Sequence, residues 1–474
     1  MPPERYHAMH RRIVRAALCF ALALACVLSA HPRAQSRNRP PNFIIILTDD
    51  QGYGDLGSYG HPTLRTPNID RMAAEGQRWT SFYTAPVCTP SRAQLLTGRL
   101  AVRTGLAGGV LFPDSTGGLQ PDEITIAELL KGRGYATAAI GKWHLGVLPE
   151  YLPTRQGFDS YFGIPYSNDM DQTGVGLSAD ERFQRYMHAR IEFFNVPLMR
   201  GAAIVERPAQ QTTITRRYTD EALTFIRSHR DRPFFLYLAH NFPHMPLFRS
   251  KEFEDRSQRG LYGDTVEEID WNVGRILDAL RDSKLEQDTL VLFMSDNGPW
   301  APYLEEGGSA GLLRGAKAST WEGGMRVPAI FRWPGAIPAG VVTGIGSELD
   351  LLPTLARLAG APLPSARVLD GYDLSATLRG QSPSPRDTLF YYASTRGGML
   401  SAVRHGAYKA HFVVPGAAAD ASPQLYNLDQ DPSEKYDLAA RHPEVLAKLR
   451  KLADDHLKTI APVKDQIATR STNR

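Results

Sequence analysis

The chain has 474 residues, of which 42% are hydrophobic and 22% are charged. That length suffices for two or three domains, or for one large domain with a smaller one attached. The net charge is +4, but the first 34 residues carry this excess, so the remainder is close to neutral. Because no block of like charges occurs, the composition excludes a nucleic-acid-binding tail and a polybasic membrane patch.

Residues 1–34 have the pattern of a secretory signal peptide. Arg11, Arg12 and Arg15 precede the apolar run AALCFALALACVLSA, and small residues lie near its end. This run is too short to span a bilayer comfortably, and no later segment approaches the necessary length. We therefore expect an exported protein, periplasmic or secreted, with no membrane span. The absence of any Asn-x-Ser/Thr sequon is consistent with a bacterial origin.

Three cysteines occur in the chain: Cys19, Cys26 and Cys88. Removal of residues 1–34 leaves Cys88 as the only thiol. An exported protein with one cysteine forms no internal disulfide, so its stability depends on its core alone.

Buried strands and amphipathic helices alternate along most of the chain that follows. Each expected strand is a short apolar run ending in polar residues, as is typical of a strand covered on both faces. The segments that carry these elements are residues 41–50, 66–84, 122–146, 232–244 and 264–299. Two of the helices are expected to end at Gly76 and at Gly134. The alternation predicts an α/β domain over residues 35–385, with a large, mostly parallel sheet sandwiched by helices.

Shorter strand candidates separated by turn signals begin near the linker SPSPRD, residues 382–387. They predict a smaller C-terminal domain over residues 386–474, with an antiparallel sheet and one helix. That helix is expected to begin at Pro443. Its expected apolar face consists of Val445, Leu449, Leu452 and Ile460.

Oxygen-bearing side chains follow two of the predicted strands. Asp49 and Asp50 end the first strand, and Asp296 and Asn297 end another. Since ligands of open parallel sheets bind beyond the carboxyl ends of the strands, these residues are expected to lie together. Three carboxylates would repel one another unless a cation lay between them. An all-oxygen set favours Ca²⁺ or Mg²⁺ over zinc.

Cationic and imidazole side chains lie at other strand ends and in loops. Each one alone has an ordinary explanation, because Lys and Arg are usually solvated and a lone His more often packs than reacts. Together they suit an anionic substrate held against the metal. These residues are Arg92, Lys142, His144, His244 and Lys317, and His240 also lies at a strand end.

Cys88 begins the segment CTPSRAQLLTGR. The tripeptide TPS that follows it is typical of a helix start with a hydroxyl cap, and Gly98 can end the helix. Backbone N–H groups at a helix N-terminus favour an anion. Arg92 lies about one turn further on and can reach back toward position 88. The residues alone allow either a reactive thiolate or an anion site here.

The segment CTPSRAQLLTGR resembles the signature of type I sulfatases, in which this cysteine is oxidised to Cα-formylglycine. Other matching motifs follow in the family's order: DD, GKWHLG, DNG, KASTWEGGMRVP and LYNLDQDPSEKYDL. GFDSYFGIPYSNDM and YKAHF resemble the branch of arylsulfatase A and N-acetylgalactosamine-6-sulfatase, although the disulfide cysteines of that branch are absent. The resemblance covers nearly all of the chain after residue 34 and implies an alkaline-phosphatase-like fold.

The resemblance also implies the cofactors. Formylglycine would be made from Cys88 by a formylglycine-generating enzyme, and the metal would be Ca²⁺, with Mg²⁺ possible. The implied metal ligands are Asp49, Asp50, Cys88, Asp296 and Asn297.

The reaction implied by the resemblance is hydrolysis of sulfate monoesters. One hydroxyl of the hydrated aldehyde, activated by the metal and Asp296, would attack sulfur. Lys317 and His244 would hold the sulfate and supply a proton to the departing alcohol. His144 would deprotonate the second hydroxyl, so that the C=O re-forms and sulfate leaves. The remaining roles are orientation of the hydrate by Arg92 and Lys142, a substrate-site hydroxyl on Ser167, and a weaker substrate contact by His411.

Two alternative functions remain open at this point. A phosphate or phosphonate monoester hydrolase of the same superfamily would use similar groups, although such enzymes often carry His where this chain has Asn297. A non-catalytic binder of sulfated glycans is the second alternative, and retention of every catalytic residue disfavours it. Aryl sulfates, sulfated sugars and glycosaminoglycan ends all fit as substrates, and the sequence predicts no oligomeric state.

Overall fold

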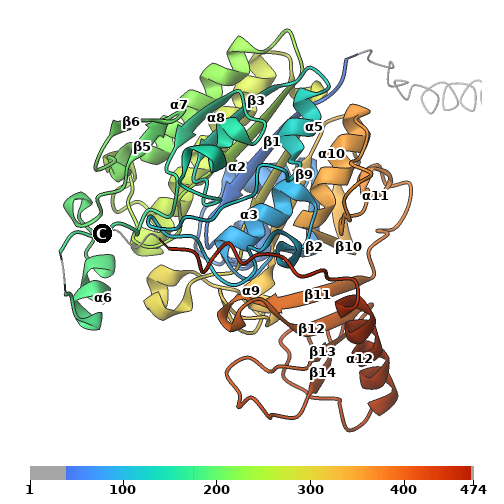
Figure 1. Ribbon diagram of the computed structural model, residues 1–474. Coiled ribbons are helices and arrows are strands. Elements are labelled where there is room, and N and C mark those ends of the chain that lie inside the picture. The colour runs from blue at the N-terminus through green and yellow to red at the C-terminus, as the bar shows by residue number, and fades with distance from the viewer. Residues whose placement is uncertain (1–38, 175, 471–474) are drawn as a thin grey trace, which may run out of the picture. The chain divides into compact units, whose positions relative to one another are not determined.

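The computed structural model describes residues 39–174 and 176–470, and a ten-stranded mixed sheet forms its centre (Figure 1). In spatial order the strands are β10 (Gly340–Ser347), β2 (Gln77–Tyr83), β9 (Arg326–Arg332), β8 (Thr289–Ser295), β1 (Asn42–Thr48), β7 (Phe234–Ala239), β3 (Ala136–Gly141), β4 (Ser160–Gly163), β5 (Leu198–Arg200) and β6 (Ala203–Glu206). The predicted signal peptide, residues 1–34, lies outside the described residues.

The central strands of this sheet are parallel. Strands β8, β1, β7, β3 and β4 run in one direction, so their carboxyl ends lie along one edge. Strand β9 is antiparallel to both β8 and β2, and β5 and β6 are antiparallel at the other side of the sheet. The predicted mostly parallel sheet is therefore confirmed, with its antiparallel pairs away from the centre.

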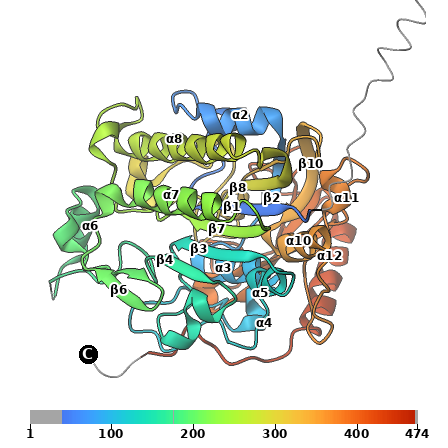
Figure 2. The same ribbon diagram turned by 90° about the horizontal axis from the view of Figure 1, so that it is seen from above.

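Helices cover both faces of the sheet (Figure 2). Strand β1 shows why, because alternate side chains of a strand point to opposite faces. Ile44 and Ile46 belong to one core cluster, and Ile45 and Leu47 belong to the other. The first cluster includes side chains from α2 (Pro67–Glu75), α7 (Gln211–Ser228) and α8 (Gly260–Asp282). The second includes side chains from α3 (Cys88–Thr97), α5 (Ile126–Lys131) and α10 (Leu351–Ala359).

A separate antiparallel sheet follows near the C-terminus, with the strand order β11 (Thr388–Ala393), β12 (Met399–His405), β13 (Tyr408–His411) and β14 (Gln424–Asn427). Helix α12 (Pro443–Leu457) packs on it through Leu449 and Ala453. A small core cluster joins the two sheets, in which Tyr83 of β2 packs with Tyr391 of β11. The second sheet and its helix are as predicted, whereas the domain boundary at residues 385 and 386 stays a prediction.

Two details of the predicted helices are wrong. Helix α12 begins at Pro443 as expected but ends at Leu457, so Ile460 is not on its apolar face. Helix α5 ends at Lys131 with Gly132 as its C-cap, and Gly134 lies in the following turn with φ of 82°. A glycine tolerates that positive φ without a steric penalty.

The other short helices are α4 (Ala101–Thr104), α6 (Ala179–Met187), α9 (Glu322–Met325) and α11 (Ser375–Leu378). Within the described ranges, no helix is both long enough and apolar enough to cross a bilayer.

Candidate active site

The predicted strand-end residues gather where the central strands end. Asp49 and Asp50 directly follow β1, and Asp296 and Asn297 directly follow β8. Lys142 directly follows β3, and the loop after β7 carries His244. All six of these residues are at least 97% buried. The parallel arrangement of β8, β1, β7 and β3 therefore places groups from four segments of the chain at one edge.

Cys88 is the first residue of α3, all ten residues of which are buried. The N-cap residue is Val87, without a side-chain cap, so the predicted hydroxyl cap is wrong. Instead the Thr89 hydroxyl donates to the carbonyl of His144 at 2.9 Å, which joins the start of α3 to the loop after β3. Gly98 ends the helix with φ of 65°, as predicted.

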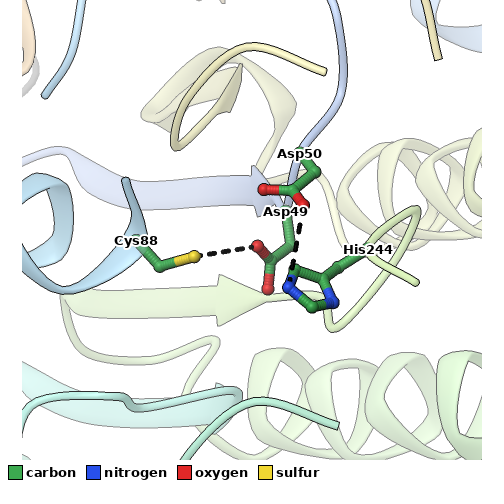
Figure 3. A group of neighbouring side chains, drawn as sticks. All are labelled: Asp49, Asp50, Cys88 and His244. Atoms are coloured by element: carbon green, nitrogen blue, oxygen red, sulfur yellow. Dashed lines mark hydrogen bonds and ion pairs between the residues drawn. The ribbon is translucent and has the colours of Figure 1, made fainter. Parts of the chain in front are cut away.

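Four of these residues could together hold a metal ion. Asp49, Asp50, Cys88 and His244 each offer one ligand atom, and these atoms lie within 4.8 Å of one another (Figure 3). The Sγ atom of Cys88 is 3.4 Å from Oδ1 of Asp49, and Nε2 of His244 is 3.6 Å from Oδ2 of Asp50. The sequence motifs assigned His244 to the substrate, but its ring also faces the predicted metal ligands.

The two other predicted metal ligands lie beside this group. The Asp50 N–H donates to Oδ1 of Asp296 at 3.2 Å, and Nδ2 of Asn297 donates to Oδ1 of Asp50 at 2.7 Å. Oδ1 of Asn297 is buried and accepts no hydrogen bond within the described residues. Leaving a buried acceptor unsatisfied costs about 1–3 kcal/mol. An amide oxygen near three carboxylates is a donor set that suits Ca²⁺ or Mg²⁺, so the residues present fit such an ion.

Arg92 contacts three different segments at the centre of the site. Its Nε and Nη2 donate to Oδ2 of Asp296 at 3.2 and 2.8 Å, and its Nη1 donates to the carbonyl of Lys142 at 2.7 Å. The Arg92 side chain is fully buried. It also lies 3.5 Å from Oδ2 of Asp49. The planar guanidinium thus joins α3 to the ends of β1, β8 and β3.

Two lysines complete the cationic side of the site. Lys142 donates to Asp49 and lies 3.4 Å from Sγ of Cys88 and 3.1 Å from Oγ of Ser167. Lys317 donates to Asp50 at 2.8 Å. Three carboxylates therefore face three cations in this cluster. A bound divalent ion would add an excess of positive charge, which favours an anionic substrate.

Burial changes the protonation of the acidic groups. It raises the pKa of Asp50 to about 7, with Asp49 and Asp296 adding to the effect and Lys317 opposing it. Burial also raises the pKa of Asp49, but the surrounding positive charges, with Lys142 the largest, together outweigh burial and keep this pKa below its ordinary value. Burial and the charge of Asp49 raise the pKa of the Cys88 thiol. A protonated thiol is a poor nucleophile, so the thiolate alternative lacks support.

The two histidines of the site are neutral. Burial and Lys142 lower the pKa of His144 well below its ordinary value, and burial and Lys317 do the same for His244. Nε2 of His144 lies 2.8 Å from the carbonyl of Leu111, so it carries the proton and leaves Nδ1 with a lone pair. That Nδ1 atom is buried without a partner in the described residues.

In His244 the tautomer is reversed. Nδ1 contacts the carbonyl of Met245 and therefore carries the proton. Nε2 is left as an acceptor, 3.4 Å from Oγ of Ser167. The site thus presents one imidazole lone pair on the Ser167 side and another at His144.

Two of the residues considered from sequence do not join the cluster. Nε2 of His411 contacts Oε1 of Glu434 at 2.7 Å, and its ring packs 4.3 Å from that of Trp321. It is fully buried, a setting that does not favour substrate contact, and its predicted role stays a prediction. Both ring nitrogens of His240 are buried without partners among the described residues.

The sequence patterns missed one aromatic neighbour of the site. The ring of Trp300 lies 4.5 Å from Nζ of Lys317 and 4.8 Å from the ring of His244. The only available signal was its position, three residues after Asn297 in the sequence DNGPW.

Comparisons with known proteins identify the family of this chain. A family model described as Sulfatase matches residues 41–361, and one described as C-terminal region of aryl-sulfatase matches residues 384–474. Arylsulfatase A of Homo sapiens is 45% identical over 444 residues, which cover 87% of each chain. N-acetylgalactosamine-6-sulfatase of Canis lupus familiaris is 40% identical over 479 residues, which cover 90% of this chain and 88% of the relative.

The fold is similar to that of solved structures. One from work on glycosaminoglycan metabolism by Bacteroides thetaiotaomicron matches with a TM-score of 0.79 and 29% identity, covering 89% of this chain and 100% of that one. Family and fold therefore confirm the resemblance to sulfatases that the sequence motifs indicated. The chain belongs to the sulfatase family and is an enzyme of the branch that contains arylsulfatase A and N-acetylgalactosamine-6-sulfatase.

Proposed function

We propose that this sulfatase hydrolyses sulfate monoesters through a formylglycine made from Cys88, with Ca²⁺ as the metal. The observation that carries the proposal is the setting of Cys88. Its Sγ atom lies 3.4 Å from both Oδ1 of Asp49 and Nζ of Lys142, at the start of a fully buried helix. A side chain here is surrounded by groups for binding a metal and an anion, which an ordinary core cysteine does not need.

The metal and the modified residue have separate contributions. The residues that would hold the ion are Asp49, Asp50, residue 88, Asp296 and Asn297, with Mg²⁺ as the alternative ion. The ion would act as a Lewis acid, and the hydrated aldehyde would supply a nucleophilic hydroxyl and a second hydroxyl whose deprotonation releases sulfate.

The protein's own side chains orient the group at position 88 and move protons. Arg92 and Lys142 are anchored by Asp296 and Asp49, and they orient the group at position 88. His144 has a free Nδ1 lone pair, which supports its role as the base. Lys317 carries protons at Nζ, so it is the proton donor to the departing alcohol.

His244 acts differently from the expectation drawn from the motifs. Because its proton lies on Nδ1, its Nε2 accepts rather than donates. We assign its ring to accepting the Ser167 hydroxyl, so that it positions Ser167 beside the bound sulfate ester.

The substrate class follows from the relatives. Their names specify aryl sulfates in one case and a sulfated amino sugar in another. We propose an aryl sulfate or a sulfated carbohydrate as the substrate. The chain is exported by residues 1–34 to a bacterial periplasm or the exterior, and residues 35–385 form the catalytic domain, with residues 386–474 as the smaller one. A formylglycine-generating enzyme is the maturation partner.

Mass spectrometry of the peptide that contains position 88 tests the proposal. The chain is produced with and without a formylglycine-generating enzyme, and sulfate release from p-nitrophenyl sulfate is measured on each sample. The modified fraction and the activity are expected to rise together. Full activity in a sample whose Cys88 is unmodified would refute the proposal.

Two parallel assays separate the alternatives. Faster hydrolysis of p-nitrophenyl phosphate than of the sulfate would support the phosphatase reading. Binding of sulfated glycans by the modified protein without sulfate release from any ester would support the non-catalytic reading.

A further inference from the structure

A row of aromatic side chains leads away from the active site. It starts at Trp300, whose indole lies beside both Lys317 and His244. The side chains of those two residues are only 9% and 4% exposed, whereas Trp300 is half-buried. The indole is therefore the part of this contact that reaches solvent.

The row continues outward through two neighbouring segments. Tyr303 in the 3-10 segment η7 (Ala301–Gly307) lies 4.7 Å from Trp300, measured between ring centroids. Tyr303 stacks on two residues of α6, Tyr186 at 5.1 Å and Phe183 at 5.7 Å. Tyr303, Tyr186 and Phe183 are all half-buried. Their faces are thus partly covered by one another and partly open.

This placement matters because of what Lys317 does in the proposed reaction. If its Nζ contacts the sulfate ester, the alcohol part of the substrate leaves the buried centre beside Trp300. Ring faces prefer offset stacking or edge contacts with other rings, and they shield apolar area from water. A partly exposed row that begins at the sulfate-binding groups is therefore suited to a ring in the leaving alcohol.

We infer that Trp300 and Tyr303 form the subsite that binds the ring of the leaving alcohol and so determine which sulfate esters are used; this inference rests on the proposed function. Trp300 contacts the ring atoms nearest the ester, and Tyr303 extends the surface outward. Tyr186 and Phe183 hold Tyr303 in position through stacking and do not themselves contact the substrate.

The test compares a ligand that has a ring with one that has none. For the mature calcium-loaded chain and the variant Tyr303→Leu, we would measure KM for p-nitrophenyl sulfate and for a hexose 6-sulfate. We would also measure Ki for inorganic sulfate as a competitive inhibitor. Loss of one aromatic contact is expected to raise KM of the ring esters by about tenfold. The Ki of inorganic sulfate should not change, because that ion has no leaving group.

Two further variants control for general effects. Tyr303→Phe keeps the ring, so its KM should lie nearer to the wild-type value than the KM of Tyr303→Leu. Trp271→Leu removes an indole that is 42% exposed on α8 and should change neither constant. Comparison of the KM values for the hexose 6-sulfate and for p-nitrophenyl sulfate shows whether the subsite prefers a sugar ring or an aromatic ring.

The outcomes separate this inference from the proposed function. An unchanged KM of both ring esters in Tyr303→Leu, or an equal rise in KM and in the Ki of sulfate, would overturn the subsite. Absence of sulfate release by the wild-type chain from every ester would overturn the proposed function instead.

Discussion

Lys409 of the small sheet is bonded to the loop that carries Lys317. Its Nζ atom donates to the carbonyl of Thr320 at 2.8 Å and to Oε1 of Glu322 at 2.9 Å. The same Nζ lies 3.0 Å from Oε1 of Glu434, whose other oxygen accepts the Glu322 N–H at 2.7 Å. Lys409, Glu322 and Glu434 are fully buried. The C-terminal sheet therefore fixes one wall of the active site.

Replacing Lys409 by Met should affect stability and catalysis together. The change removes the lysine that two buried carboxylates share and leaves Glu322 with Arg326 at 3.4 Å, a loss on the order of 3–5 kcal/mol. It also removes the hydrogen bond to the Thr320 carbonyl, which lies three residues after Lys317 in the same loop. We expect a lower urea midpoint and a lower kcat/KM for p-nitrophenyl sulfate. Lys448→Met, at an exposed site on α12, is the matched control. Unchanged unfolding in Lys409→Met would mean that this buried network does not hold the loop.

Asp49→Asn should weaken calcium binding. The substitution removes a carboxylate charge from the group of possible ligands, and we expect the calcium Kd to rise by about tenfold or more. Isothermal titration with calcium measures this without reference to activity. Excess calcium should stabilise the wild-type chain by about 2.7 kcal/mol at one hundred times its Kd. Asp270→Asn is the control, since Asp270 is also buried but accepts hydrogen bonds from α2. Equal calcium affinity in both variants would exclude Asp49 as a ligand.

Arg92→Lys should destabilise the fold although the charge is kept. A lysine ammonium cannot reproduce the paired bonds to Asp296 together with the bond to the Lys142 carbonyl. A loss of about 3 kcal/mol is expected from breaking this buried pair. Arg275→Lys, which alters a partly exposed ion pair on α8, should cost less than about 1 kcal/mol. Denaturant unfolding of the two variants would contradict this account if their midpoints fell equally.

His456 should make stability dependent on pH. Its ring stacks on Phe390 at 3.6 Å and its Nε2 accepts the hydroxyl of Tyr392 at 2.8 Å. Burial lowers the pKa of His456 to about 4 from 6.5. The unfolded chain takes up this proton near pH 6.5, but the folded chain does so only near pH 4. The stability contribution is therefore complete above pH 6.5 and is lost as the pH falls toward 4.

His456→Gln removes that titration, so its thermal midpoint should decline less between pH 6.5 and 4 than that of the wild type. His442→Gln alters a more exposed histidine just before α12 and should keep the wild-type slope. Parallel slopes for His456→Gln and wild type would show that His456 titrates at its ordinary pKa in the folded chain.

The local sequence predicted the central strands because their apolar composition indicates burial on both faces. Strand β7 is an unbroken apolar run, β1 and β8 are apolar between one polar residue at each end, and all three are fully buried. Strands β9 and β10 and helices α7 and α10 were not predicted. Strand β9 lies between β2 and β8 and is antiparallel to both, a pairing that depends on segments far apart in the chain.

The candidate site was predictable to the extent that it follows strand ends. Asp49, Asp50, Asp296 and Asn297 meet because parallel strands place their carboxyl ends together. The same reasoning could not separate His244, which faces the cluster, from His240, which does not. Both follow β7 within five residues, and only the path of the loop decides between them. Nor does any local pattern indicate that Lys409 bonds to Thr320, 89 residues earlier.

The complete burial of α3 has a consequence for biosynthesis. Only 1% of Cys88 is accessible, and every residue of its helix is covered. If Cys88 is oxidised as we propose, the modifying enzyme has to reach this segment before α3 is buried. Molecules that fold before that reaction would then stay unmodified and inactive.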